Sequence, residues 1–383
     1  MHKLTFSDDA AAKHLDCYFQ AIHDVLEHLA NGGELFHHVP GIKGPQPFTL
    51  AKTNGCVRGL FILLFQHCST RNDNFLVALP DRLWNLIDKI DHYVSVHGWD
   101  VTRSPYLECV VLLNHIFSYD RFKGGIGLVF NKKRRTVKGK DSKKLTSGRF
   151  KGVRWSAMDY IQSLNVRYCP YCNAETVYAI EFKKERPQVK SVRSALDHYF
   201  PQSRYPFLSI SLGNLVPSCT RCNTDIKRDR ELDYNRHLNP FMADFHDAVR
   251  FICKPIKADV GFQVEDIKSE DGFLLSLVER TSGALAQKGL ALGRFFLVSD
   301  VYNLLFKYEA LLDIYRSRLA GSKYYAYVRE MLKENLSDEQ IRELFCGVLE
   351  NPADINKVRL SKLALDMHEM VVRCANGGNP WGR

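Results

Sequence analysis

Apolar residues recur at helical spacing in the first third of the chain. Between residues 8 and 31 they are Leu15, Phe19, Ile22, Leu26 and Leu29. Because an α-helix turns once in about 3.6 residues, these side chains share one face and predict an amphipathic helix, with Asp8 or Asp9 as its N-cap. The same periodicity predicts further helices over residues 55–67, 81–97 and 105–119. Residues 1–120 are therefore expected to form an N-terminal helical domain.

The pattern changes to strand-like runs in the second half of the chain. Apolar stretches punctuated by Lys, Asp and Gly predict a small antiparallel sheet over residues 249–253, 261–267 and 272–280. Helical spacing returns from residue 290 onward, and its aromatic positions are those of a helix core rather than of a cofactor site. Residues 246–383 are therefore expected to be a small sheet followed by a mainly helical region.

The composition is that of a folded globular protein. Of the 383 residues, 45% are hydrophobic and 25% are charged, which is enough apolar material for one large core or several smaller ones. The N-terminus lacks the apolar segment of a secretory signal, and the longest apolar runs are shorter than a membrane span. We therefore expect a cytoplasmic protein that does not contact a membrane.

Positive charge is concentrated in one segment of the chain. The net charge is +10, and residues 121–154 contain thirteen Lys and Arg side chains against one Asp. Their Gly, Ser and Thr content predicts a loop or hairpin, and residues 121–160 are expected to be a basic connecting segment. The segment is either a solvated linker or a strap that follows a phosphate backbone. The candidate nucleic-acid contacts in it are Lys132, Lys133, Arg134 and Arg135.

Two pairs of cysteines have the spacing of zinc ligands. Cys169 and Cys172 form one CxxC pair, and Cys219 and Cys222 form the second, after 46 intervening residues. Each CxxC turn points two thiolates toward one ion, and two such turns complete a tetrahedron with no open position for a substrate. Redox chemistry and chance spacing are the alternatives, but matched pairs in a reducing compartment favour a structural zinc site.

Four polar residues follow in order inside and beside this cysteine frame. They are Asp197, His198, Asn214 and Asn223, in the local sequences LDHYFP, NLVPSC and CTRCN, after CPYC. The arrangement resembles the HNH nucleases of the ββα-metal superfamily, specifically a bacterial branch that includes Septu-type anti-phage nucleases. The resemblance lies within a nuclease core expected over residues 161–245 and does not extend to the flanking helical regions.

The resemblance implies an α+β fold, in which two antiparallel strands and a helix form the ββα-metal core. Asp197 and His198 would lie at the first strand, Asn214 at the second, and Asn223 at the start of the helix. His198 would be the general base, since a neutral imidazole can take a proton from the attacking water near pH 7. Asp197 and Asn223 would hold a catalytic Mg²⁺ or Mn²⁺ through their oxygen atoms. Asn214 would orient His198 through hydrogen bonds to the backbone.

Two positions depart from the pattern of the family. Asn223 stands where many members carry a final histidine, which leaves the preferred metal open. Gln202 stands where close relatives often carry lysine, so a phosphate contact made there would need Arg204 or Lys227 instead. His237 is kept only as a candidate substrate contact.

These residues lead us to expect an endonuclease that hydrolyses phosphodiester bonds, with DNA as the expected substrate. The family implies an effector of anti-phage defence that is restrained by a regulatory partner such as an ATPase. Two alternatives are a zinc-containing nucleic-acid-binding protein without catalysis and a secreted nuclease toxin. The Asp-His pair argues against the first, because a pure binder does not need it, and the reduced cysteines and large flanks argue against the second.

Overall fold

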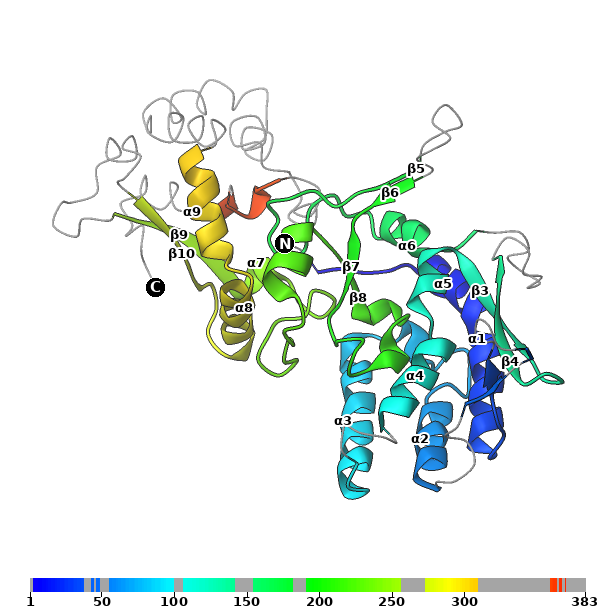
Figure 1. Cartoon of the computed structure of the whole chain (residues 1–383). Coiled ribbons are helices and arrows are strands. Elements are labelled where there is room, and N and C mark those ends of the chain that lie inside the picture. Colours follow the sequence, from blue (N-terminus) through cyan, green and yellow to red (C-terminus); the bar gives the residue numbers. More distant parts are fainter. Residues whose placement is uncertain are drawn as a thin grey trace. The chain divides into compact units, whose positions relative to one another are not determined.

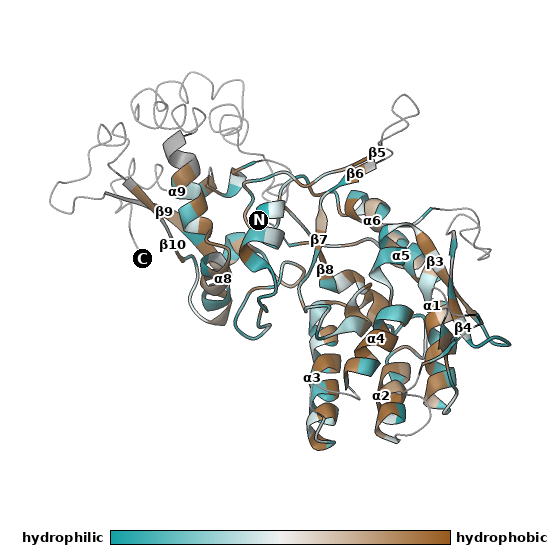
Figure 2. Cartoon of the chain, viewed as in Figure 1, coloured by the Kyte–Doolittle hydropathy of each residue, from teal (hydrophilic) through white to brown (hydrophobic). Residues whose placement is uncertain are grey.

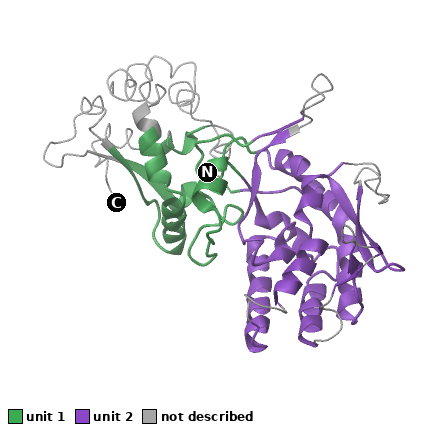
Figure 3. Ribbon diagram, viewed as in Figure 1, with its two compact units in different colours: residues 1–3, 166–177, 218–383 green, residues 4–165, 178–217 purple. Residues whose placement is uncertain are grey.

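The chain forms two compact units. The computed structural model describes residues 3–37, 43–44, 46–48, 55–99, 106–141, 154–181, 191–255, 273–308, 359–363, 365–366 and 369. Unit 1 comprises residues 1–3, 166–177 and 218–383, and unit 2 comprises residues 4–165 and 178–217 (Figure 3). Both units combine helices with small sheets, so the fold is α+β, as expected. The units do not follow the boundaries expected at residues 120, 160 and 245, because the chain passes from one unit to the other several times.

Unit 2 contains the helices expected from the N-terminal periodicity. They are α1 (Asp8–Ala30), α2 (Gly55–Gln66), α3 (Pro80–Val96), α4 (Tyr106–Ile116), α5 (Tyr119–Lys123) and, further along the chain, α6 (Ala157–Ser163) (Figure 1). The predicted helices over 8–31, 55–67, 81–97 and 105–119 are thereby confirmed. The N-cap of α1 is Ser7 instead of Asp8 or Asp9, because the Ser7 side chain accepts a hydrogen bond from the N–H of Ala10.

The apolar face of α1 forms part of the core of unit 2. Of its predicted core positions, Leu15, Ile22, Leu26 and Leu29 are buried and Phe19 is half-buried. The helix packs against α2 and against strand β3, while its other face carries hydrophilic residues (Figure 2). Burial of each leucine or isoleucine contributes roughly 1.5–3 kcal/mol, so this face is sufficient to hold the helix on the unit.

The basic segment forms a hairpin that belongs to unit 2. Strands β3 (Ile126–Asn131) and β4 (Thr136–Asp141) pair in antiparallel fashion, and residues 132–135 make the turn between them. Together with β1 (Phe36–His37) and β2 (Gln46–Pro47) they form a sheet of order β2-β1-β4-β3. The predicted hairpin is confirmed. It packs on α1 rather than standing apart as a connector, because Leu128 and Val137 are buried.

The candidate nuclease residues of unit 2 lie on or next to a second set of short strands. Strands β5 (Ala179–Glu181) and β6 (Ser191–Arg193) pair antiparallel, and β7 (Ala195–His198) and β8 (Leu215–Ser218) form a two-stranded sheet. The buried Tyr160 of α6 donates its hydroxyl to the carbonyl oxygens of Leu212, at 2.7 Å, and Leu215, at 3.2 Å. These bonds tie the residues at the start of β8 to helix α6.

The described elements of unit 1 lie mostly after residue 218. Its elements are η6, a π-helical segment (Arg221–Lys227), α7 (Phe245–Ala248), β9 (Val249–Pro255), β10 (Phe273–Glu279), α8 (Ala284–Phe295) and α9 (Val298–Tyr308). Strands β9 and β10 are antiparallel, which confirms the predictions over 249–253 and 272–280. The predicted strand over 261–267 lies outside the described residues. The helical pattern begins at residue 284, earlier than expected from residue 290.

Within the part of the chain that the structure describes, none of the helices has both the length and the apolar character that crossing a bilayer requires.

Candidate functional site

The four cysteines of the two CxxC pairs meet in unit 1. Cys169, Cys172, Cys219 and Cys222 are all buried, and their sulfur atoms lie within 4.8 Å of one another. The Sγ atoms of Cys172 and Cys219 are 3.8 Å apart. Ligands at the corners of a tetrahedron with Zn–S bonds of about 2.3 Å are separated by roughly the same distance. The cluster could therefore hold a metal ion, and its sulfur-only composition fits a structural zinc.

Each cysteine pair is shaped by its own backbone hydrogen bonds. In the first, the carbonyl oxygen of Cys169 accepts from the N–H of Asn173 at 2.7 Å, and Asn173 adopts a left-handed conformation with φ of 54°. In the second, the N–H of Cys222 points at the sulfur of Cys219 at 3.4 Å. An amide donor to sulfur stabilises a thiolate, which is the form that binds a metal. The first turn is therefore closed by the backbone, and the second also supports a thiolate at Cys219.

Neighbouring groups stabilise negative charge on the sulfur of Cys172. Hydrogen bonds from Cys169, Cys219 and Cys222 hold the pKa of the Cys172 thiol well below its usual range. Arg221 places its guanidinium 3.9 Å from the sulfur of Cys172 and also pairs with Glu175 at 3.0 Å. A cationic neighbour that is itself held by a carboxylate is a fixed source of positive potential.

Distant parts of unit 1 attach to the first cysteine turn. The hydroxyl of Tyr302 in α9 donates to the carbonyl oxygen of Cys172 at 2.8 Å, and the ring of Tyr171 stacks on Phe296 with centroids 4.2 Å apart. The N–H of Leu360 donates to the carbonyl oxygen of Asn173 at 3.0 Å. The metal-binding turn is thus a packing centre for residues far along the chain, which its CxxC spacing did not predict.

The candidate general base, His198, is the last residue of β7 in unit 2. Its Nε2 lies 2.9 Å from the carbonyl oxygen of Ser209. A carbonyl oxygen can only accept, so Nε2 carries the hydrogen and, in the neutral ring, Nδ1 is the basic nitrogen. The ring of Tyr119 meets the imidazole edge-on, with centroids 4.8 Å apart and an interplanar angle of 70°. His198 is therefore held in one tautomer and one orientation.

Asn214 makes the side-chain bonds to the backbone that were expected of it. Its Oδ1 accepts from the N–H of Phe200 at 2.7 Å, and its Nδ2 donates to the carbonyl oxygens of Phe200 and Leu208, both at 3.1 Å. Leu208 immediately precedes Ser209, whose carbonyl holds His198. The buried amide therefore fixes both the residue after the strand and the loop that orients the imidazole.

The two expected ligands of the catalytic metal belong to different units. Asp197 is buried at the end of β7 in unit 2, and Asn223 lies in the first turn of η6 in unit 1. The backbone N–H of Asn223 donates to the carbonyl oxygen of Cys219 at 3.0 Å, so the position of Asn223 is tied to the second cysteine turn. Lys227, the last residue of η6, is buried, and its contact with a phosphate stays a prediction.

The remaining candidate contacts are engaged with the protein itself. Arg204 forms a half-exposed ion pair with Asp91 at 3.1 Å, and the Gln202 amide donates to Asn114 at 3.1 Å. The backbone N–H of Asp233 donates to Nδ1 of His237 at 3.0 Å. Exposed ion pairs contribute about 0–1 kcal/mol, so the Arg204 pair is weak enough to exchange for a phosphate.

Two of the four basic side chains in the hairpin turn form ion pairs with the rest of the protein. Lys132 pairs with Asp24 at 3.4 Å, and Arg135 pairs with Glu34 at 3.4 Å while lying over the ring of Phe36. The other two candidate contacts of the turn, Lys133 and Arg134, are exposed.

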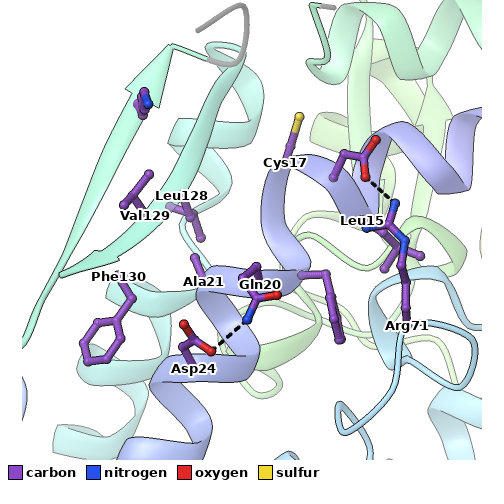
Figure 4. A pocket seen from close by; sticks show the side chains of 12 residues that line it. Leu15, Cys17, Gln20, Ala21, Asp24, Arg71, Leu128, Val129 and Phe130 are labelled. Carbon is purple, nitrogen blue, oxygen red and sulfur yellow. Dashed lines mark hydrogen bonds and ion pairs between the residues drawn. The ribbon is translucent and has the colours of Figure 1, made fainter. Parts of the chain in front are cut away.

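A cavity of about 420 Å³ lies elsewhere in unit 2, between α1 and the β3–β4 hairpin (Figure 4). Arg71 pairs with Asp16, and the amide of Gln20 donates to Asp24 at 2.9 Å. None of the candidate nuclease residues lines this cavity.

Tyr119 and Ser209 are contacts of the candidate base that the sequence did not point to. Both are ordinary residue types in that segment, and only the fold brings them to His198.

Comparison of the chain with models of protein families, with curated proteins and with solved structures found no match in any of the three.

Proposed function

We propose that this protein is a metal-dependent endonuclease of the HNH type, with β7 and β8 as the two strands of its ββα-metal core. The observation that carries the proposal is the orientation of His198. Its Nε2–H donates to the carbonyl oxygen of Ser209. Asn214, the residue before β8, donates a hydrogen bond to the carbonyl oxygen of Leu208 in the same loop. A general base needs one tautomer and one direction, and this arrangement supplies both.

In the proposed reaction His198 acts as general base. Nδ1 takes a proton from a water molecule as the oxygen of that water bonds to the phosphorus of the scissile phosphodiester. The bond between phosphorus and one ester oxygen breaks, and the leaving oxygen takes a proton from solvent. Water is thus divided between the two products, and the imidazolium returns its proton to solvent before the next turnover.

Asp197 would help to hold the catalytic metal. A carboxylate is a hard oxygen ligand of the kind that Mg²⁺ and Mn²⁺ accept. Bound there, the ion would supply positive charge to stabilise the phosphoryl oxygens. Asn223 remains a second candidate ligand on the resemblance of the motifs alone. The cluster of Cys169, Cys172, Cys219 and Cys222 would hold a separate, structural zinc.

DNA is the proposed substrate, and the basic hairpin is its proposed contact. The exposed Lys133 and Arg134 offer charge for backbone phosphates, and such contacts carry no sequence preference. We further propose a role in antiviral defence with a regulatory protein partner such as an ATPase. This part of the proposal depends on the resemblance of the motifs to the anti-phage branch of the HNH family.

Cleavage assays on matched variants test the proposal. Wild type, His198→Ala and the control His92→Ala, which removes an exposed histidine of α3, are purified with their zinc content measured. Each is incubated with plasmid DNA, single-stranded DNA and RNA in Mg²⁺ or Mn²⁺ and in EDTA. We expect metal-dependent cleavage by wild type and the control, and loss of at least about 100-fold in His198→Ala.

Two results would contradict the proposal. One is equal cleavage by His198→Ala and wild type. The other is absence of cleavage by zinc-loaded wild type that still binds DNA, which would favour a nucleic-acid-binding protein without catalysis. Cleavage of RNA alone would retain the mechanism but replace the substrate.

A further inference from the structure

Ser209 connects the candidate base to the helical part of unit 2. Its carbonyl oxygen accepts from Nε2–H of His198 at 2.9 Å, and its side-chain hydroxyl donates to the backbone carbonyl oxygen of Phe117. Its own N–H donates to the carbonyl oxygen of Pro206 at 3.2 Å. The amide, the carbonyl and the hydroxyl of this buried residue are thus bound to three different residues, so its peptide groups cannot turn without breaking a hydrogen bond.

The place of Phe117 in the chain makes it a firm support for this hydroxyl. Phe117 directly follows the last residue of α4, where the carbonyl oxygens have no partner inside the helix. Its side chain is buried and packs on the ring of Phe75, with centroids 5.7 Å apart. A buried carbonyl oxygen without a donor is costly, and the hydroxyl of Ser209 supplies that donor. The end of α4 and the loop that holds His198 are therefore joined by a buried hydrogen bond.

The same short segment also reaches the imidazole directly. Tyr119 comes two residues after Phe117 and is the first residue of α5. Its ring meets that of His198 edge-on, with centroids 4.8 Å apart and an interplanar angle of 70°. The junction between α4 and α5 thus contacts the imidazole through the ring of Tyr119, and holds it a second time through the hydrogen bonds of Ser209.

We infer that Ser209 is a positioning residue for the candidate base, because its hydroxyl, bound to Phe117, sets the direction of the carbonyl that holds Nε2–H of His198. The inference rests on the proposed nuclease function. The hydroxyl acts through the carbonyl and does not touch the reacting atoms. Asn214 holds the adjacent carbonyl, that of Leu208, so two buried side chains fix neighbouring peptide groups of one loop. Such support matters because a displacement of about 1 Å in a reacting group can cost about 100-fold in rate.

Matched serine variants of the full-length, zinc-loaded protein test the inference. Ser209→Ala removes the hydroxyl and keeps the carbonyl, whereas Ser209→Thr keeps a hydroxyl. The control is Ser211→Ala, because Ser211 is a buried serine of the same loop whose hydroxyl has no hydrogen-bond partner among the described residues. kcat and KM are measured on a DNA substrate with Mn²⁺. The NMR signal of Nε2–H of His198 is recorded without added Mn²⁺ in protein with isotope-labelled histidine, and it is assigned by its loss in His198→Ala.

We expect Ser209→Ala to lower kcat about tenfold and to leave KM within about twofold, because a loosely held base slows proton transfer without weakening DNA binding. The Nε2–H of His198 should exchange faster with solvent in this variant, so its NMR signal should weaken or disappear. Ser209→Thr should retain the signal and at least about half of kcat, since the donor to Phe117 is kept. Ser211→Ala should match wild type in both measurements.

The outcomes separate this inference from the proposed function. If His198→Ala is inactive while Ser209→Ala keeps the NMR signal and a kcat within about threefold of wild type, the inference fails and the nuclease stands. Equal losses in Ser209→Ala and Ser211→Ala would also refute it, because the hydroxyl of Ser209 would then have no special role. Absence of cleavage by zinc-loaded wild type would overturn both the proposed function and the inference.

A further variant keeps the test valid if Ser209→Ala folds poorly. Ser209→Cys is close to serine in size and carries only a weak donor, so it should lower kcat and weaken the NMR signal. Wild-type behaviour of Ser209→Cys in both measurements would count against the inference.

Discussion

The side chain of Asn214 forms two hydrogen bonds with the backbone of Phe200, accepting from its N–H at 2.7 Å and donating to its carbonyl at 3.1 Å. The side-chain amide of Asn214 thus makes the same pair of hydrogen bonds to Phe200 that the backbone of a neighbouring strand would make. A further bond from the same amide reaches Leu208, next to the carbonyl that orients His198. One buried residue therefore couples the end of β7 to the loop that holds the candidate base.

Replacing this amide should destabilise unit 2 and loosen His198 together. Asn214→Ala removes three hydrogen bonds and leaves three buried backbone groups without their partner, so we expect a loss of about 3 kcal/mol in the free energy of unfolding. Cleavage should fall as well. Urea unfolding measures the first effect. The control is Gln202→Ala, whose half-buried amide donates to Asn114 in the same region and should cost less than about 1 kcal/mol. Equal losses in the two variants would contradict the bracing role.

The cysteine cluster should bind one zinc ion per chain. Cys219→Ser removes one ligand and should abolish stoichiometric zinc, measured by elemental analysis. The control Cys56→Ser alters a half-buried cysteine of α2 outside the cluster and should retain the metal. Retention of zinc by Cys219→Ser would show that the ion binds elsewhere.

Loss of zinc should also release residues that pack on the first cysteine turn. Leu360 and Tyr302 bond the backbone of Asn173 and Cys172, and those bonds depend on the shape of the turn. We therefore expect limited proteolysis to cut near Tyr302 and near Leu360 much faster in the chelator-treated protein than in the zinc-loaded protein. An unchanged digestion pattern would mean that the turn keeps its shape without metal.

Unit 2 should lose stability in mild acid because of His14. Burial lowers the pKa of His14 to about 3, and the indole of Trp155 donates to its Nδ1 at 3.0 Å. The unfolded chain takes up this proton near pH 6.5 and the folded chain does not, so stability from this residue is complete above pH 6.5 and declines as the pH falls toward 3. The decline should reach about 2 kcal/mol at pH 5.

A variant that cannot titrate isolates this effect. His14→Gln retains an acceptor for Trp155, and its urea midpoint should change less between pH 7 and pH 5 than that of wild type. His92→Gln, at an exposed position of α3, should follow wild type. If His14→Gln shows the same pH dependence as wild type, another group is responsible for it.

The exposed residues of the hairpin turn should set the salt dependence of DNA binding. Lys133→Gln/Arg134→Gln removes two charges that face solvent, and should lower affinity equally for unrelated sequences. The slope of log affinity against log salt concentration should become shallower by about 2, measured by fluorescence anisotropy. Lys132→Gln should have a smaller effect, because Asp24 already pairs with Lys132. A slope unchanged in the double variant would place the DNA contact elsewhere.

Much of the local structure followed from the sequence by itself. The 3.6-residue period of Leu15, Ile22 and Leu26 predicted α1, and the two CxxC pairs predicted the cysteine cluster, because in both cases the information lies in spacing within a few residues. The expected bonds of Asn214 to the backbone also stay within one segment of the chain, the one that connects β7 to β8.

The tertiary structure decided what surrounds those residues. Tyr119 meets His198, and Tyr302 and Leu360 bond the cysteine turn, through contacts between segments that are far apart in the chain. The same packing buries Lys227, which its helical position alone had suggested as a phosphate contact. Periodicity and motif spacing describe which face a residue occupies, but a contact between distant segments depends on how all the elements share one core, and only the folded chain sets that.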